Sequence, residues 1–385
     1  MLRERLTSAA FGAGWVLVCQ VPESWARAAF MLGADIAWRR QGHGVQVLEG
    51  NLRRVIGPDA DSGELRKLSR KVMRSYARYY LEDFRLHVIP RKRLLGSGLH
   101  LEGAENLGRS LEFLKNGRGV IYALPHMGNV EQAGAWVIAN GAGSFTTVAE
   151  RLALEPVYER WLKFRQGLGF EVVPTTGGPR PFGVLAQRLR VGNLVCMLAD
   201  RDLTDTGVEV DFFGEKALMA AGSAVLAVRT GAALMPASCW FVGDTGWGIR
   251  VHNEIPVPER GNPREKVAEM MQQLAAVFEQ AIKQHPEDWA HAAAGLCGRP
   301  GRGAAQADQE RHRGRQPRFV RIDVSCPAPA MPGYRGQGGG RRGLRTPPAT
   351  RRRGRRSLPG GRGQRGSAAA IMVLELGSGR GSRSG

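Results

Sequence analysis

The chain lacks an apolar run long enough to span a lipid bilayer. A spanning helix needs about 20 such residues, and the best candidate, residues 9–22 (AAFGAGWVLVCQVP), is shorter. This segment also lacks the small-residue cleavage site of a secretory signal. We therefore expect neither a membrane-spanning helix nor a cleaved signal peptide.

Cysteine is scarce, and the five cysteines are scattered without a C-x-x-C pair. This arrangement indicates neither a zinc site nor a disulfide framework, and it fits a reducing compartment. The sequence also contains no Glu-x-x-His or paired-His spacing that would indicate another metal centre. We expect no metal and no resident cofactor.

Lysine is absent from residue 291 onward, where 20 arginines accompany only four acidic residues. The formal net charge of +20 therefore divides into +4 for residues 1–290 and +16 for residues 291–385. The basic character belongs mostly to this tail and does not indicate that the main domain binds nucleic acid. Because the tail is rich in Gly, Arg and Pro, we expect residues 290–385 to be disordered.

Two origins of the tail stay open. Arg/Gly-rich sequence can bind RNA, although only Phe319 and Tyr334 supply aromatic rings for stacking. Lysine codons are AT-rich, so the absence of lysine also fits out-of-frame reading of GC-rich DNA. Loss of one nucleotide near codon 290 would allow the frame to read His-Met-Leu-Gln-Pro. We favour this frameshift, and resequencing that found the frame intact would exclude it.

Aromatic and basic residues share the N-terminal segment WARAAFMLGADIAWRR (residues 25–40). Trp25, Phe30 and Trp38 beside Arg39 and Arg40 suit a helix lying at a lipid headgroup boundary. An N-terminal helix packed on its own domain would show the same pattern. We expect membrane-associating helices over residues 1–45, resting on an anionic membrane surface.

The rest of the main region, residues 46–289, alternates between two sequence patterns. Short β-branched or apolar runs bounded by Gly are separated by segments with helical spacing, and a last amphipathic helix ends before Pro286. The expected strands cover residues 119–126, 144–150, 170–175, 193–200, 232–240 and 247–255. This alternation predicts an α/β fold with a mostly parallel central sheet flanked by helices.

The strongest local motif is ALPHMGNVEQAGAW, in which His126 follows a buried strand. Asn129 is a good helix N-cap, and Gln132 stands at the capping-box position. With His126 on the loop and Glu131 in the first helical turn, the two side chains can meet, and the carboxylate would orient the imidazole as a base. A strand-end histidine satisfied by the backbone is the alternative, since one His-x4-Glu is a weak motif.

Charged residues follow two other predicted strands. Asp200, Arg201 and Asp202 end the strand at 193–200, and ligands of open α/β sheets lie beyond such ends. Glu150 ends another strand, and Arg165 lies on the helical stretch after it, together with further basic residues that suit the phosphates of an anionic donor. Both groups equally fit exposed, solvated surfaces.

Several of these motifs, in this order, resemble the bacterial lysophospholipid acyltransferase-like family, which includes the lipid A lauroyl/myristoyl acyltransferases. Within it, residues 1–289 look most like the actinobacterial acyltransferases of phosphatidylinositol mannosides. The resemblance rests on His126-x4-Glu131, Ala199-Asp200-Arg201-Asp202, Phe212-Phe213-Gly214 with Gly222 downstream, and His285-Pro286-Glu287-Asp288-Trp289.

The resemblance implies palmitoyl transfer from acyl-CoA, as co-substrate, to the 6-hydroxyl of the mannose on inositol position 2. It also implies a peripheral enzyme on the cytoplasmic face of the plasma membrane. By motif position, His126 would be the base and Glu131 its orienting carboxylate, while Glu150, Arg165, Asp200 and Arg201 would bind substrate. Oligomeric state is not indicated.

Two departures from the family matter. Many relatives carry Asp where this chain has Glu131, and the family continues as His-Met-Leu-Gln-Pro where the Arg/Gly tail begins. A related acyltransferase acting on a lipid A precursor or a lysophospholipid is the alternative enzyme. RNA binding through the tail is the alternative from another class.

Overall fold

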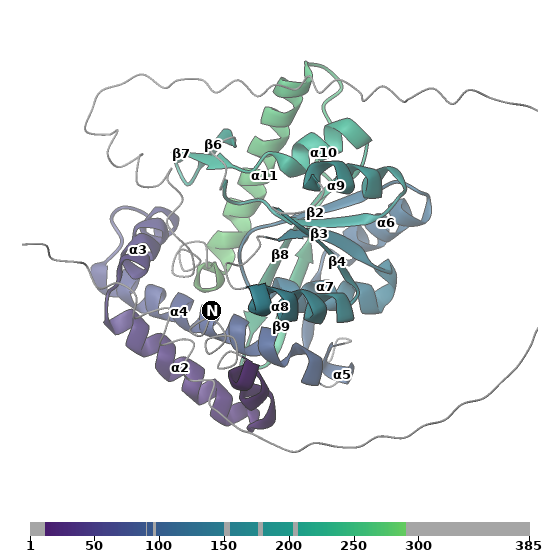
Figure 1. Cartoon of the computed structure of the whole chain (residues 1–385). Coiled ribbons are helices and arrows are strands. Elements are labelled where there is room, and N and C mark those ends of the chain that lie inside the picture. Colours follow the sequence, from purple (N-terminus) through teal and green to yellow (C-terminus); the bar gives the residue numbers. More distant parts are fainter. Residues whose placement is uncertain are drawn as a thin grey trace, which may run out of the picture. The chain divides into compact units, whose positions relative to one another are not determined.

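The computed structural model describes residues 12–89, 91–94, 98–149, 155–175, 180–202 and 207–289 (Figure 1). The tail expected to be disordered (residues 290–385) and the expected site residue Glu150 lie outside these ranges. None of the described helices is long and apolar enough to cross a membrane.

The central sheet has seven strands in the order β1-β9-β8-β2-β5-β3-β4. All neighbouring strands are parallel except β8 and β9, which run antiparallel, so the predicted mostly parallel α/β fold is confirmed. The bounds are β1 (Leu99–Glu102), β2 (Val120–Leu124), β3 (Phe145–Ala149), β4 (Phe170–Pro174), β5 (Leu194–Leu198), β8 (Ala233–Val242) and β9 (Gly246–Val251). The short edge strand β1 was missed because its alternation of apolar and polar residues extends over only four positions, LHLE.

Strand β2 lies at the centre and is buried along its whole length. Its side chains alternate between two cores: Ile121 and Ala123 face one, and Val120, Tyr122 and Leu124 face the other. Continuous apolar sequence in β2 thus reflects helices covering both faces of the sheet.

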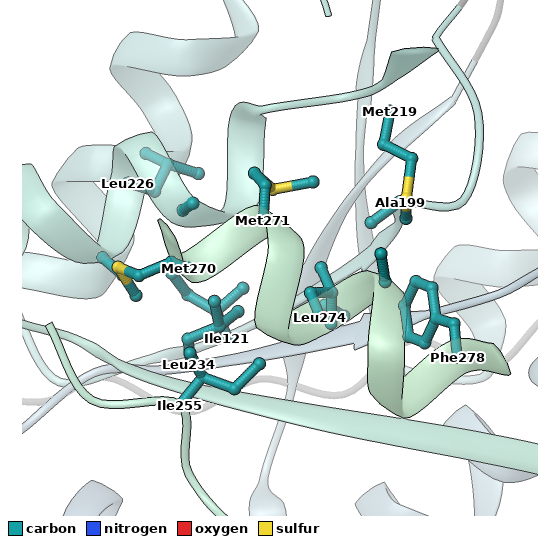
Figure 2. Close-up of a cluster of buried hydrophobic side chains, with 14 of the residues drawn as sticks. Ile121, Ala199, Met219, Leu226, Leu234, Ile255, Met270, Met271, Leu274 and Phe278 are labelled. Carbon is teal, nitrogen blue, oxygen red and sulfur yellow. The ribbon is translucent and has the colours of Figure 1, made fainter. Parts of the chain in front are cut away.

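One core lies under α9 (Pro181–Arg190), α10 (Gly222–Thr230) and α11 (Pro263–Gln284), and Figure 2 shows Met270, Met271, Leu274 and Phe278 of α11 packed there. The other core lies under α6 (Ala104–Lys115), α7 (Val130–Val137) and α8 (Glu155–Gly167). The predicted last amphipathic helix is α11, whose apolar residues Val267, Met271, Leu274, Phe278 and Ile282 are buried.

The N-terminal region is helical: residues 12–20, α2 (Glu23–Arg39), α3 (His43–Ile56) and α4 (Ser62–Arg85). Buried residues of α2, α3 and α4 form a core of their own, which includes Ala34, Leu48, Leu52 and Val72. The domain boundary expected between residues 45 and 46 falls inside α3. The described residues also form four short helical elements: η1 (Leu86–Val88), α5 (Arg91–Leu94), η2 (Ile138–Ala142) and η3 (Pro286–Asp288).

The Phe212-Phe213-Gly214 motif forms the turn between two strands that the sequence did not reveal, β6 (Val208–Phe212) and β7 (Glu215–Met219). Phe213 and Gly214 both have positive φ, 51° and 76°, as a two-residue hairpin of the I′ type requires. Positive φ is unusual for Phe. The Phe213 amide donates a 2.6 Å hydrogen bond to Oε1 of Glu279 on α11, which holds the turn in place.

Candidate active site

His126 and Asp200 lie side by side at the carboxyl edge of the sheet. Strands β2 and β5 are parallel neighbours in which Leu124 pairs with Leu198, so residues 126 and 200 each stand two positions beyond a paired residue. Oδ1 of Asp200 lies 2.5 Å from Nδ1 of His126, and Oδ2 accepts the His126 backbone N–H at 3.0 Å. The two motifs therefore meet beyond the ends of these strands.

The electrostatic arrangement suits a base. The side chain of Asp200 is fully buried, while that of His126 keeps 19% of its surface exposed. With Nδ1 donating its proton to the carboxylate, Nε2 is the acceptor nitrogen and carries the lone pair. A histidine ordered in this way takes a proton from a hydroxyl while the carboxylate stabilises the imidazolium that forms.

Glu131 does not hold the imidazole, which corrects the expected pairing of His126 with Glu131. Asn129 caps α7 by accepting the Gln132 amide N–H at 2.9 Å, so Glu131 enters the first turn as predicted. Its buried carboxylate then forms an ion pair with Arg165 of α8. The helix turns Glu131 toward α8, whereas Nδ1 of His126 faces β5. The other half of the capping box is also missing, because the Gln132 side-chain amide makes no hydrogen bond.

Arg165 is an interior residue, not part of an exposed helix face. Its side chain is 12% exposed, and its guanidinium carbon lies 3.6 Å from the ring centroid of Trp161. Burial lowers the pKa of Arg165, while the neighbouring Tyr79 and Asp83 act in the opposite direction. Burial also raises the pKa of Asp83 to about 6, against the opposing effect of Arg165. Two buried carboxyl groups, Glu131 and Asp83, thus accompany one buried guanidinium.

Two predicted site residues remain, Arg201 and Glu150, and Asp202 lies beside the first of them. Arg201 follows Asp200 directly, is partly buried, and has a buried Nε atom without a hydrogen-bond partner in the structure. Asp202 accepts the amide N–H of Gly207 at 2.7 Å. Glu150, one residue beyond β3, lies outside the described residues.

Trp289 also belongs to the site, although sequence reasoning gave it no role. Its indole Nε1 donates a hydrogen bond to Oδ2 of Asp200 at 3.1 Å, and Trp289 forms an isolated antiparallel bridge with Met127. The only signal in the sequence was its place in the His285–Trp289 motif, more than eighty residues from Asp200.

A candidate metal group within the described residues, His285, Glu287 and Asp288, has ligand atoms within 4.8 Å of one another. Both oxygens of Asp288 already accept hydrogen bonds, from Ser75 Oγ and the Phe241 amide. These bonds account for Asp288 without a metal ion.

Residues 1–291 match the family model described as bacterial lipid A biosynthesis acyltransferase. The chain is also similar to phosphatidylinositol mannoside acyltransferase of Mycolicibacterium smegmatis, with 46% identity over 287 residues that cover 74% of this chain and 90% of that protein. The chain is 45% identical to the enzyme of the same name from Mycobacterium tuberculosis strain H37Rv over 293 residues, which cover 74% of this chain and 86% of that protein.

Proposed function

The chain belongs to the bacterial lipid A biosynthesis acyltransferase family and is an acyltransferase, and on this basis we propose that it acylates a phosphatidylinositol mannoside. The donor is acyl-CoA, with palmitoyl-CoA the expected form. The acceptor group is the 6-hydroxyl of the mannose on inositol position 2. The observation that carries this proposal is the His126–Asp200 pair, which is arranged to activate a hydroxyl.

In the proposed reaction, Nε2 of His126 takes the proton from the mannose hydroxyl as its oxygen attacks the thioester carbonyl. A carbon–oxygen bond forms, and the tetrahedral intermediate collapses with cleavage of the carbon–sulfur bond. The imidazolium returns its proton to the departing thiolate of CoA. Asp200 holds Nδ1 throughout and stabilises the positive charge on the ring.

Basic and acidic residues near the catalytic pair are the proposed substrate contacts. The guanidinium groups of Arg165 and Arg201 are the proposed partners for oxygen atoms of an anionic donor, and each has a buried Nε atom that makes no hydrogen bond in the structure. Glu131 serves this binding by holding Arg165 through its ion pair. Glu150 keeps its proposed place among the substrate-binding residues.

We also propose that α2 docks on the anionic cytoplasmic face of the plasma membrane. Ala26, Ala34 and Ala37 pack against the rest of the protein. On the other side of the helix, Trp25 is 73% exposed, and Leu32 and Ile36 are also exposed. Arg39 and Arg40 follow at the end of this stripe, both exposed. An exposed apolar stripe that ends in arginines suits the boundary between acyl chains and anionic headgroups.

Release of free thiol from palmitoyl-CoA, with and without phosphatidylinositol mannoside, tests the reaction. The wild-type full chain should show acceptor-dependent release, and tandem mass spectrometry of the product should locate the acyl group on mannose. His126→Ala should lower kcat by roughly 10²- to 10⁴-fold. His43→Ala, which removes an exposed histidine of α3, is the matched control.

The outcomes separate the alternatives. Near-wild-type turnover of His126→Ala would refute the assignment of the base. Release that depends on a lysophospholipid or a lipid A precursor, and not on the mannoside, would replace the acceptor. If the protein bound RNA in a salt-sensitive way, and this affinity disappeared when residues 291–385 were removed, the alternative of RNA binding through the tail would be supported.

A further inference from the structure

The His285–Trp289 segment returns from the end of α11 to the loop that carries His126. The Gly128 amide donates a 3.1 Å hydrogen bond to the Asp288 carbonyl, and Met127 and Trp289 form their backbone bridge beside it. Gly128 has a φ of 59°, and a Cβ atom there would lie 2.4 Å from the Cys239 carbonyl carbon. The loop that carries His126 therefore lies in close contact with β8 on one side and with the His285–Trp289 segment on the other.

Asp288 fixes this segment to two other elements. Its Oδ1 accepts the Ser75 hydroxyl of α4 at 2.6 Å, and its Oδ2 accepts the Phe241 amide of β8 at 2.8 Å. Asp288 is 4% exposed. These buried hydrogen bonds fix the backbone position of Asp288 and so the position of the next residue, Trp289.

Trp289 itself reaches the catalytic carboxylate. Its ring is buried and lies 6.2 Å from Phe212 and 5.9 Å from Phe213, at the turn between β6 and β7. The indole N–H and the His126 backbone N–H both donate to Oδ2 of Asp200, which directs Oδ1 to Nδ1 of His126. A buried carboxylate needs several donors. Two of the donors to Asp200 share Oδ2, so rotating the carboxylate away from its present orientation would break both of these hydrogen bonds.

We propose that Trp289 is a positioning residue of this enzyme, whose indole N–H orients Asp200 and thereby His126. The inference rests on the proposed acyl transfer. It gives the His285–Trp289 motif a chemical role: Asp288 sets the position of the segment, and Trp289 delivers a hydrogen bond to the active site.

Trp289→Phe tests the proposal, because it removes the N–H and keeps an aromatic ring. We expect kcat to fall roughly 10- to 100-fold, as for loss of one hydrogen bond to a charged group. KM should change little because the hydrogen bond that is removed goes to Asp200. Phe212→Leu is the matched control: it weakens packing around the indole but leaves its N–H, and kcat should stay near wild type.

A double-mutant cycle separates positioning from structural support. In the Asp200→Asn background, Trp289→Phe should lower kcat by less than about threefold, because the oriented carboxylate is already gone. A second readout uses no lipid: proton NMR of protein with ¹⁵N-labelled histidine should show a far-downfield Nδ1–H resonance for His126. It should be present in the wild type and Phe212→Leu and lost in Trp289→Phe.

Two results would overturn the inference: wild-type kcat in a folded Trp289→Phe variant, or an equal effect of Trp289→Phe in both backgrounds. Failure of the proposed function is distinguishable, because the wild type itself would then release no thiol with the mannoside. The NMR comparison would still decide whether Trp289 orients the pair.

Discussion

Replacing Asp200 by Asn tests the catalytic pair most directly, because the structure predicts which way the amide will face. Oδ2 accepts two N–H groups, from His126 and Trp289, and Oδ1 accepts one. An amide satisfies more donors when its oxygen takes the Oδ2 position. Its NH₂ group then points at Nδ1 of His126, which must become an acceptor.

This orientation reverses the histidine tautomer. Nδ1 of His126 would carry the lone pair and Nε2 the proton, so the nitrogen that serves as the base in the proposed reaction could no longer accept a proton. General-base help contributes roughly 10²- to 10⁴-fold, and the equivalent Asp-to-Asn change in a Ser-His-Asp triad lowers kcat by about 10⁴. We expect kcat of Asp200→Asn to fall by at least about 10²-fold, with KM for palmitoyl-CoA changed far less.

The assay is thiol release at saturating palmitoyl-CoA and mannoside, for protein whose folding is checked by circular dichroism. Asp202→Asn is the matched control, since Asp202 accepts the amide N–H of Gly207, whereas Asp200 accepts the N–H groups of His126. Its kcat should stay within a few-fold of wild type. A folded Asp200→Asn variant that kept kcat within about threefold would refute the reasoning, because the tautomer would not then matter.

Two further predictions concern the membrane and pH. Trp25→Ser combined with Leu32→Ser should weaken sedimentation with anionic phospholipid vesicles at least tenfold, since each exposed apolar side chain contributes roughly 1.5 to 3 kcal/mol when buried. Val191→Ser alters a 64% exposed valine beyond α9 and should leave vesicle binding unchanged. Unaltered vesicle binding of the double variant would exclude α2 as the docking surface. Burial raises the pKa of Asp288 from 3.8 to about 6, so its contribution to the free energy of unfolding is fully present below about pH 4 and is lost as pH rises through about 6. In urea unfolding between pH 4 and 7, the free energy of unfolding of the wild type should fall by about 2 to 3 kcal/mol relative to that of Asp288→Asn. If the difference in unfolding free energy between the two proteins stayed constant over this range, the raised pKa of Asp288 would be contradicted.

The alternation of short apolar runs with helical spacing was enough to predict the architecture of the main domain. It predicted the parallel sheet because each run is short, bounded by Gly and followed by an amphipathic segment, and these are local properties. It also placed His126 and Asp200 at strand ends, since both follow directly on buried runs, β2 and β5. Parallel strands end at one edge, so their proximity was a reasonable expectation.

Tertiary structure alone decided which side chains pair. The order of strands puts β5 between β2 and β3, so Asp200, which is 74 positions along the chain, lies next to His126. Glu131, only five positions away, is turned toward Arg165 by the helix that its own cap begins. Hydrogen-bond partners depend on strand order and helix rotation, which are set by packing of the whole domain and leave no mark in local spacing. For the same reason no pattern in the sequence revealed that Trp289 would reach the catalytic carboxylate.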